Sequence, residues 1–494
     1  MTKTGRRRSR TRDFCLTICS LAGVVLVWSR LANLGTSFWS DEAYSAYYYS
    51  GRGPRGIFFG TYVPNNHALF NLLSWVTTGA VGRFEASYRI WSVVPGLGAV
   101  ALAAWWAWKR LGPVAATLIV VLATVSPVHL VLTPQARGYG LAMFAGVVML
   151  VGAVRASDRQ STRDVWLFAA GALIGIWTLP VFALAAVAQA AVLLWDRRLR
   201  KPTLIACGVI AAASLAFYAP MLGDIAHNSH QRFGSRLAVV NAVTGVYHHL
   251  AAPTISNAMP AAPHAVVNDF ATFLVIALLT VAAVVRLLRA KEGALLAHLT
   301  VPIFGTYTAL VIGRFYVQPR FASYLLFPVL VLLAIGGQQI WDAFAPVAAA
   351  RVVAAIAIAA IALTGTVRVA DLTAAQAKLP WENYRFVADL AKSTTFRYIV
   401  SDTTHPGALY YYLGPKRVLL LGPGAVAKQA YCGLKGRFIF ADDSYRRPTP
   451  LNVKCLLDRR AFRIRVPQQE HPPIRAPGAL TVYLVPATRT GSRP

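Results

Sequence analysis

Long runs of apolar residues, separated by short polar connections, recur through roughly the first three-quarters of the chain. Most of these runs approach the ~20 residues that an α-helix needs to cross the hydrocarbon core of a bilayer. The pattern therefore predicts a polytopic α-helical membrane protein with about eleven spans. Their approximate ranges are 14–34, 91–109, 114–132, 139–154, 165–179, 180–195, 202–222, 268–287, 295–313, 321–340 and 349–367.

The basic residues between these runs predict the orientation of the chain, because short cytoplasmic connections are rich in Lys and Arg. With the N-terminus in the cytoplasm, the inner connections contain RRRSRTR at 6–12, DRRLRK at 196–201 and RLLRAK at 286–291. The weakest point is the split at Pro180, since merging the two spans beside it would invert everything that follows. The charge pattern beyond Pro180 favours the split.

The N-terminal segment MTKTGRRRSRTR also has the composition of a signal-peptide n-region. The apolar run after it, 14–34, is too long for a typical signal peptide and lacks a clear cleavage site, so we expect a retained first span. The protein is therefore expected to be a multi-pass protein of the plasma membrane. The outer connections are then 36–90, 134–140, 223–266 and 314–321.

Two segments outside the spans have patterns of their own. The apolar stretch 68–82 is too short to span comfortably, and we expect it to lie along the membrane surface. After about residue 370, helical stretches alternate with short strand-like runs, which predicts a small α/β domain. The expected strands are RYIVSD, RVLLL and RFIFADD, and the expected helices are PWENYRFVADLAKS, GALYYYLG and PGAVAKQAYCG. The transmembrane domain is thus expected at 1–369, and an extracytoplasmic domain at 370–494.

Composition agrees with the membrane class, because 56% of the 494 residues are hydrophobic and only 14% are charged. The net charge of +30 is also typical of nucleic-acid-binding proteins. We do not expect nucleic acid as a partner, since the basic residues cluster between apolar runs and do not form one stripe. In the C-terminal segment, Cys432 and Cys455 either form a disulfide or remain two unpaired thiols.

An acidic pair stands where the first span leaves the membrane. Asp41 and Glu42 lie in SFWSDEAY, with aromatic residues on both sides. A carboxylate near a bilayer surface is costly unless it faces water or a cation. Held in a cleft, it can act as a general base; the plainer alternative is a solvated helix end.

Cationic residues are predicted at the same membrane face. His67 stands in the first outer connection, Arg137 in PQARGYG, and Arg314 and Arg320 in the last outer turn. Guanidinium groups suit phosphate because they present a planar fork of donors. Taken singly, His67 could be an ordinary surface histidine, and each arginine could extend to lipid headgroups. Together they fit a reaction on a lipid-linked phosphate in one external hollow.

The order of these motifs resembles the GT-C superfamily of membrane glycosyltransferases. It is most similar to the bacterial branch of protein O-mannosyltransferases and aminoarabinose lipid A transferases. The motifs are WSDEA, NNHALF, PQARGYG and QPRF, and the spans to about residue 370 match in architecture. Family members often have His-Pro-Leu or Lys-Pro-Pro-Leu where this chain has His67-Ala68-Leu69, so the missing proline leaves the shape of this loop open.

The resemblance implies a sugar donor linked to polyprenyl phosphate and used at the outer membrane surface. Asp41, with Glu42 beside it, would accept the proton of the acceptor hydroxyl. The leaving phosphate would be stabilised by cationic and polar side chains: His67, Arg137, Arg314 and Arg320. A direct displacement implies inversion at the anomeric carbon and requires no cofactor or metal ion. A divalent cation near Asp41 or Glu42 is the alternative.

Residues of the same motifs are expected to contact the substrate: Trp39, Tyr44, Asn66 and Tyr139. Aromatic residues here can stack on a sugar or line the prenyl entrance, but Tyr and Trp also belong to the aromatic belt of any membrane protein. In the outer domain, Tyr410, Tyr411 and Tyr412 could bind a glycan, although we favour one turn of a core-packed helix. The Ala-, Val- and Arg-rich composition suggests a GC-rich genome, and by analogy mannose or arabinose on a polyprenyl carrier.

Two other classes of function stay open. A transporter or flippase for a lipid-linked glycan should show ionisable residues at mid-membrane depth and often inverted repeats. These spans are apolar runs with the acids at one face. A structural or assembly subunit with a degenerate site is the third class, and the presence of Asp41, Arg137 and Arg320 argues against it. The sequence leaves the acceptor open among a lipid, a glycan and a protein.

Overall fold

The chain consists of two compact units. The helical unit comprises Met1–Ala32, Thr61–Leu73 and Arg89–Thr373, and the sheet unit comprises Asn33–Gly60, Ser74–Tyr88 and Ala374–Pro494. The predicted boundary at 369/370 stays a prediction, and the sheet unit also includes two segments of the first outer connection. The computed structural model describes residues 3–485 except 61–62, 64–65, 229–245, 259–264, 314–318, 345–346, 379–382, 394–397, 402–406, 415, 417, 421–436, 443–460 and 465–480.

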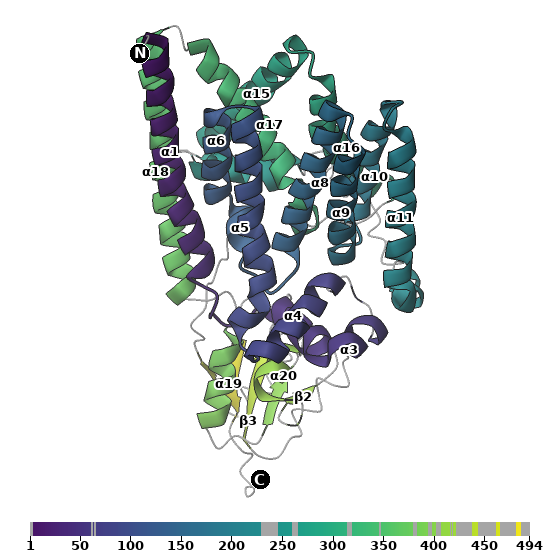
Figure 1. Cartoon of the computed structure of the whole chain (residues 1–494). Helices are drawn as coiled ribbons and strands as arrows, with labels where there is room; N and C mark the ends of the chain where they lie inside the picture. Colours follow the sequence, from purple (N-terminus) through teal and green to yellow (C-terminus); the bar gives the residue numbers. More distant parts are fainter. Residues whose placement is uncertain are drawn as a thin grey trace, which may run out of the picture. The chain divides into compact units, whose positions relative to one another are not determined.

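Long helices form the helical unit (Figure 1). Its main helices are α1 (Lys3–Leu31), α5 (Glu85–Arg110), α6 (Pro113–Val125), α8 (Tyr139–Arg159), α9 (Thr162–Thr178), α10 (Phe182–Trp195), α11 (Arg200–Tyr218), α15 (Ala265–Arg289), α16 (Gly293–Ile312), α17 (Leu326–Phe344) and α18 (Ala348–Lys378). Shorter helical pieces are α7 (Pro127–Leu132), α12 (Leu222–Asn228), α14 (Ala252–Ala258), the π-helical η4 (Val246–Ala251) and the 3₁₀ turns η3 (Ala219–Met221) and η5 (Pro319–Leu325).

Each of the eleven predicted spans overlaps one of these main helices. The break between α9 and α10 falls beside Pro180, where the split was predicted. Within the described residues, eight helices are long and apolar enough to cross a membrane, while α6 and α10 are apolar but shorter. The chain is thus a multi-pass helical membrane protein, and the number of eleven spans stays a prediction.

Burial separates central from peripheral helices in this unit. α8 and α17 are largely buried, whereas α11, α15 and α18 leave most of their apolar length exposed. α8 and α9 pack closely because Gly152 and Gly171 have no Cβ, which at either position would collide with the backbone of the other helix. Exposed apolar side chains are compatible with hydrocarbon surroundings, so the peripheral helices present the surface expected to face lipid.

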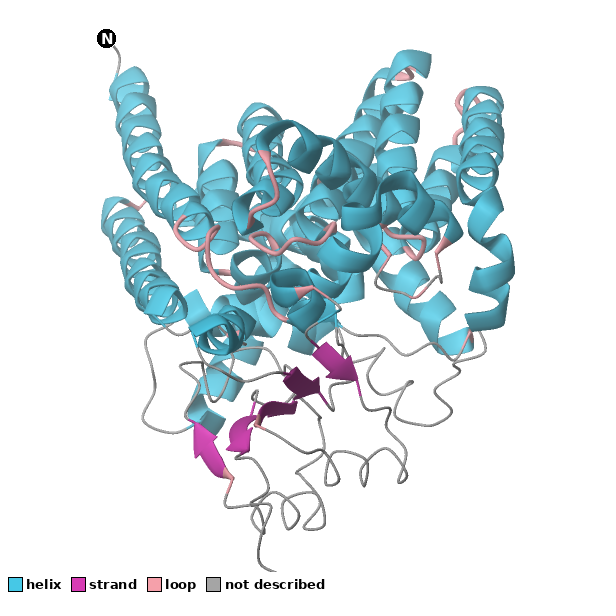
Figure 2. Cartoon of the chain, turned by 90° about the horizontal axis from the view of Figure 1, so that it is seen from below, coloured by secondary structure: helices cyan, strands magenta, loops and turns pink. Residues whose placement is uncertain are grey.

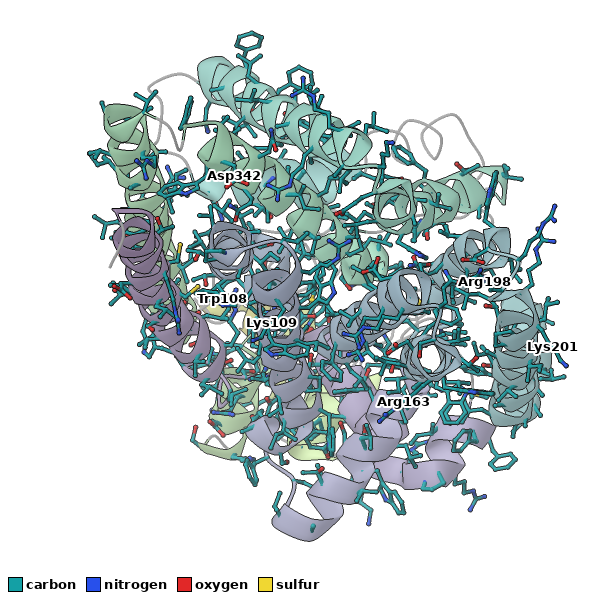
Figure 3. The ribbon with its side chains drawn as sticks, turned by 45° about the horizontal axis from the view of Figure 1, so that its top comes forward. Trp108, Lys109, Arg163, Arg198, Lys201 and Asp342 are labelled. Atoms are coloured by element: carbon teal, nitrogen blue, oxygen red, sulfur yellow. The ribbon has the colours of Figure 1, made fainter. Side chains whose placement is uncertain are left out.

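Ion pairs join helices at one end of the helical unit. Arg110, the last residue of α5, contacts Asp158 of α8 at 3.1 Å and Glu292 at 3.0 Å. Arg286 of α15 contacts Asp342 of α17 at 2.8 Å. Figure 3 shows further basic residues at helix ends and turns here: Lys109, Arg163, Arg198 and Lys201. This enrichment is what the positive-inside rule expects of a cytoplasmic face, and the orientation itself stays a prediction.

Arg30, in the last turn of α1, is fully buried and ties four helices together. Its Nη2 donates to the carbonyls of Ala123 at 2.9 Å and Thr124 at 3.1 Å, where α6 ends. Its Nε donates to His129 Nδ1 of α7 at 3.2 Å. His129 Nε2 therefore carries the proton and donates to the Gly96 carbonyl of α5 at 3.1 Å. Arg30 thus supplies donors and positive charge to the open carbonyls at a helix C-terminus.

The sheet unit holds a five-stranded mixed sheet, whose strands Figure 2 shows side by side. β1 pairs in parallel with β2 and β3, and β5 pairs antiparallel with β3 and β4, which gives the order β2-β1-β3-β5-β4. The strands are β1 (Tyr398–Ser401), β2 (Val418–Leu420), β3 (Phe438–Asp442), β4 (Phe462–Ile464) and β5 (Thr481–Val485). The three predicted strands coincide with β1, β2 and β3.

Short helices complete the sheet unit. They are α2 (Ser40–Tyr44), the π-helical η1 (Ser45–Tyr49), the 3₁₀ turn η2 (Ser50–Arg52), α3 (Gly53–Phe59), α19 (Tyr384–Ser393) and α20 (Gly407–Leu413). α20 lies between β1 and β2 in the chain and makes the crossover that a parallel pair requires. α4 (Ala68–Val81) coincides with the predicted surface segment. The predicted helix PGAVAKQAYCG, with Cys432, and also Cys455 lie outside the described residues.

Replacing Arg30 with Leu is expected to lower the thermal unfolding temperature in detergent. The substitution leaves His129 Nδ1 and two buried carbonyls without these donors, and each such group costs about 1–3 kcal/mol. The matched control is Arg198→Gln, because the Arg198 side chain is exposed. Equal unfolding temperatures for Arg30→Leu and the control would contradict the assigned bracing role.

Candidate functional site

His67 is held at the start of α4. Its carbonyl accepts from Asn71 N at 2.8 Å, which makes the first turn of the helix. In the same turn, Asn71 Nδ2 donates to Asn66 Oδ1 at 3.0 Å, and both side chains are buried. The imidazole is only 1% exposed, so His67 is not an ordinary surface histidine.

Arg137 comes from the turn between α7 and α8. The backbone N of Arg137 donates to the Gln135 carbonyl at 2.7 Å, which tightens this turn. The side chain is fully buried within the protein, so Arg137 does not extend to lipid headgroups. Its guanidinium carbon lies 5.0 Å from the ring centroid of Tyr139, the first residue of α8. The sequence PQARGYG thus packs Arg137 on an aromatic face at a helix N-terminus, where the helix dipole favours an anion.

The backbone of Gly138 determines which ring nitrogen of His67 carries the proton. Gly138 N–H points at His67 Nδ1 at 2.9 Å, and a backbone N–H can only donate. Nδ1 therefore accepts, and the proton of the neutral ring is on Nε2. His67 Nε2 lies 3.2 Å from Arg137 Nη2, which also carries protons. Two N–H donors thus lie side by side, an arrangement that a shared anionic acceptor would stabilise.

The electrostatic surroundings keep His67 neutral. Burial lowers the pKa of His67 well below its usual value, and the positive charges of Arg137 and Arg320 lower it further. Arg320, in η5, is half-buried, and its guanidinium carbon lies 5.6 Å from the Phe321 ring centroid. His67 and Tyr139 meet edge to face at 5.0 Å. The structure thus brings His67, Arg137, Tyr139 and Arg320 into one cationic cluster.

Four of the predicted residues lie in or beside the short helix α2 of the sheet unit. Asp41, Glu42 and Tyr44 belong to the helix, and Trp39 is its N-cap. Asp41 and Glu42 stand in its first turn and are only 6% and 2% exposed, which excludes a solvated helix end. Glu42 Oε2 accepts from the backbone N of Trp39 at 3.3 Å and so caps the helix. Tyr44, at the other end of α2, packs on Tyr48 at 4.5 Å. Glu42 therefore has a structural role in capping α2.

Two of the remaining predicted site residues are Asn66, which lies in the described part of the chain, and Arg314, which does not. Asn66 supports the His67 loop through Asn71, and its Nδ2 lies 3.6 Å from Met221 Sδ. Arg314 lies outside the described residues. Among the residues that the structure describes, no three His, Cys, Asp or Glu side chains gather in a way that could hold a metal ion.

Sequence reasoning missed two buried polar clusters of the helical unit. One is Arg30 with His129; the only hint was a lone arginine at the end of an apolar run. The other is His298 of α16, whose Nδ1 accepts from Gln189 Nε2 at 2.7 Å and whose Nε2 donates to Ser157 Oγ at 2.8 Å. Both clusters lie near helix ends. In each of them, hydrogen bonds satisfy buried polar side chains, and burying such a group without a partner would cost folding free energy.

Comparisons with known proteins reveal the fold. No protein-family model matches the chain, and no curated protein matches it. Several solved structures do match the chain in fold. The apo structure of ArnT from Cupriavidus metallidurans has a TM-score of 0.55 at 13% identity, over 96% of this chain and 98% of that chain. ArnT bound to undecaprenyl phosphate has a TM-score of 0.52 at 13% identity, over 97% and 99%. The apo oligosaccharyltransferase of Archaeoglobus fulgidus has 0.51 at 13% identity, over 86% of this chain and 69% of that chain.

These likenesses define a class of helical membrane protein. ArnT and the archaeal oligosaccharyltransferase are both members of the GT-C superfamily. The chain has the GT-C fold, and the suspected resemblance is confirmed at the level of fold.

Adding a methyl group at Gly138 is expected to disturb the His67–Arg137 cluster. Gly138 has an ordinary φ of −71°, so the cost is steric and not backbone strain. A Cβ there would collide with the Thr178 methyl group and lie 3.0 Å from His67 Nδ1. Gly138→Ala should therefore lower stability by about 1–3 kcal/mol, measured by thermal unfolding in detergent.

Two further variants make this test specific. Gly208→Ala is the matched control, since a Cβ at Gly208 meets nothing within 4 Å. Thr178→Ser removes the colliding methyl group, so the double variant Gly138→Ala/Thr178→Ser should recover part of the loss. A stability loss that is the same with and without Thr178→Ser would refute the steric explanation.

Proposed function

We propose that the protein is an inverting glycosyltransferase that moves a sugar from a polyprenyl-phosphate donor to a hydroxyl group of a lipid, glycan or protein acceptor at the outer membrane face. The observation that carries the proposal is the cationic cluster. His67 Nε2 and Arg137 Nη2 are two N–H donors 3.2 Å apart. The GT-C fold also supports the proposal. In this fold, one structure of ArnT is bound to undecaprenyl phosphate.

The cluster is suited to the leaving group of this reaction. When the bond between the sugar C1 and the phosphate oxygen breaks, that oxygen gains negative charge. Donors that are already oriented stabilise such charge without reorganising, and more strongly in a site from which water is excluded. His67 is nearly inaccessible and Arg137 fully so, and Gly138 fixes the direction of the imidazole N–H. We assign His67 and Arg137 to the leaving phosphate, together with Arg320 and Arg314.

The acceptor hydroxyl needs a base, because its pKa lies far above neutral. We assign this role to the Asp41 carboxylate, which would take the proton as the acceptor oxygen bonds to C1 and the phosphate departs. In this single displacement the nucleophile attacks opposite the leaving group, so the anomeric configuration inverts. Trp39, Tyr44, Asn66 and Tyr139 are proposed to contact the sugar or the prenyl chain.

The cations of the cluster can neutralise the phosphate, so this mechanism needs no metal ion. A divalent cation near Asp41 or Glu42 is the alternative. Mannose and arabinose on a polyprenyl carrier are the first donors to test. We further propose a cytoplasmic N-terminus and an extracytoplasmic C-terminal domain at 370–494.

A transporter is the less favoured function. Arg30 and His298 are buried ionisable residues of the helical unit, as a transporter would have. Arg30 is in the last turn of α1, and His298 is near the start of α16, so neither is halfway along its helix. Both have structural hydrogen-bond partners.

Asp41→Asn should reduce transfer of radiolabelled sugar from polyprenyl phosphate by about 100-fold or more, which is the usual contribution of a general base. The amide keeps the shape of the side chain but cannot accept the proton, so donor binding should stay near the wild-type value. Asp389→Asn is the matched control, because Asp389 is an exposed acid of α19. Glu42→Gln keeps an oxygen for the Trp39 N–H and should retain most activity. Normal transfer by Asp41→Asn would remove Asp41 from the base role.

Arg137→Gln should weaken binding of undecaprenyl phosphate by about tenfold or more, because a charge-assisted hydrogen bond is worth about 1.5–3 kcal/mol. The readout is the rise in unfolding temperature that the lipid causes in purified protein. Arg159→Gln, at an exposed arginine of α8, is the control.

The pH dependence of wild-type binding should follow the phosphate monoester alone, whose second pKa is about 6. His67 should add no step of its own near about pH 6.5, the usual pKa of histidine, so His67→Asn should leave the shape of the pH profile unchanged. The lowered pKa keeps His67 neutral as the pH falls through that value. An affinity that rises with His67 protonation there would contradict the neutral, Nε2-protonated ring.

A further inference from the structure

The sheet unit contains a cavity of about 580 Å³ that the proposed transfer chemistry does not use. All the residues that line it belong to this unit. They come from η1 and η2, from the start of α5 and the two residues before it, and from α20 with Gly414 after it. Asp41 and Glu42 are not among them. Its size is within the range of about 300–1,000 Å³ that is typical of small-molecule sites.

Tyrosine rings form the walls of this cavity and are fixed by packing. Tyr410 packs on Tyr47 with ring centroids 5.4 Å apart. Tyr411 packs on Phe38 at 5.0 Å and on the buried Tyr88 at 5.9 Å. α20 is therefore packed as the sequence suggested. Yet Tyr410, Tyr411 and Tyr412 are only half-buried, and all three line the cavity.

Such walls combine apolar ring faces with hydroxyl groups. Ring faces pack against the C–H faces of a sugar, and phenol hydroxyls donate to and accept from sugar hydroxyls. Because the rings are already held by their neighbours, little side-chain freedom is lost on binding. An acyl chain would leave these hydroxyls unsatisfied, so a saccharide fits the lining better.

The cavity also carries a positive charge. Arg52 and Arg83 line it, and both side chains are exposed. The Arg52 guanidinium carbon lies 5.4 Å from the Tyr47 ring centroid, and Arg83 Nη2 donates to the Gly51 carbonyl at 3.2 Å. Both contacts hold an arginine beside the cavity without neutralising its charge.

One acid, Glu85, is among the described residues that line the cavity, and it is already engaged. Its Oε1 accepts from the Arg385 guanidinium and from the Tyr412 hydroxyl, the latter at 3.0 Å. Arg52 and Arg83 are thus left to attract an anion.

We propose that this cavity binds an acidic saccharide. Its sugar ring packs against Tyr410 and Tyr47, and its carboxylate or phosphate group is bound by Arg52 and Arg83. Binding itself does not depend on the proposed transfer; that the bound saccharide is the acceptor, or part of it, rests on that proposed function.

The test is calorimetric titration of the purified full-length chain in detergent. The probes are a disaccharide that contains glucuronic acid, the same disaccharide with its carboxyl reduced to the alcohol, and a hexose phosphate. The two acidic probes should bind at least about tenfold more tightly than the neutral one, and rising salt should remove the difference. Equal affinity for the acidic and neutral disaccharides, or no binding of any probe, would overturn the proposal.

Matched variants locate the site. Arg52→Gln/Arg83→Gln should bring the affinity for the acidic disaccharide down to that of the neutral one. Arg55→Gln, at an exposed arginine of α3 that does not line the cavity, should change nothing. Tyr410→Ala should weaken all the probes, whereas Tyr410→Phe, which keeps the ring, should bind almost normally. Unchanged affinity in the double arginine variant would exclude this cavity.

Two conditions separate this site from the donor phosphate. Saturating undecaprenyl phosphate should leave saccharide binding intact, and so should Arg137→Gln. Displacement of the saccharide by undecaprenyl phosphate would mean that the acidic probe occupies the donor site, and would overturn the proposal. Saccharide binding in a chain that transfers no sugar from any polyprenyl phosphate would support the cavity while removing the proposed function.

Discussion

The hydrogen bond from Gly138 N–H to His67 Nδ1 is the constraint on which the cationic cluster depends. It connects the start of α8 to the residue that precedes α4, and it leaves the imidazole only one nitrogen that can donate. That nitrogen lies beside the Arg137 guanidinium. Because a neutral ring and a permanent cation both present N–H groups there, the donors of the cluster stay the same over a wide pH range.

The two units show different ways of satisfying buried polar groups. In the helical unit, Arg30 and His298 each find hydrogen-bond partners on other helices, as polar groups in a water-poor bundle must. In the sheet unit, Glu85 is paired with Arg385, and Glu42 caps α2. Of the acidic pair that the sequence offers as two equal candidates, Glu42 thus has a structural role in its helix.

The apolar runs predicted the main helices, because a segment that crosses the hydrocarbon core must be both apolar and helical over most of its length. The strands β1, β2 and β3 could also be predicted, since each is a short apolar run that is bounded by turn residues. The partners of His67 were not predictable, because nothing in NNHALF indicates that a glycine of PQARGYG will meet its ring. Arg30 was missed for a related reason: two of its acceptors are backbone carbonyls, which have no sequence signature. For the tyrosines of α20, the sequence offered core packing and ligand contact as alternatives. In the structure these side chains pack on neighbouring rings and also line a cavity.

The make-up of the sheet unit has a consequence for how the protein is produced. Phe38 and Glu85 emerge from the ribosome early, but their partners Tyr412 and Arg385 are made 374 and 300 residues later. During most of translation Phe38 and Tyr88 can pack on each other but lack Tyr411, which contacts both rings. These contacts of the sheet unit can therefore form only after the intervening helices have been translated. A chain that stops before Arg385 would leave Glu85 without its ion-pair partner and the Phe38 and Tyr88 rings without Tyr411.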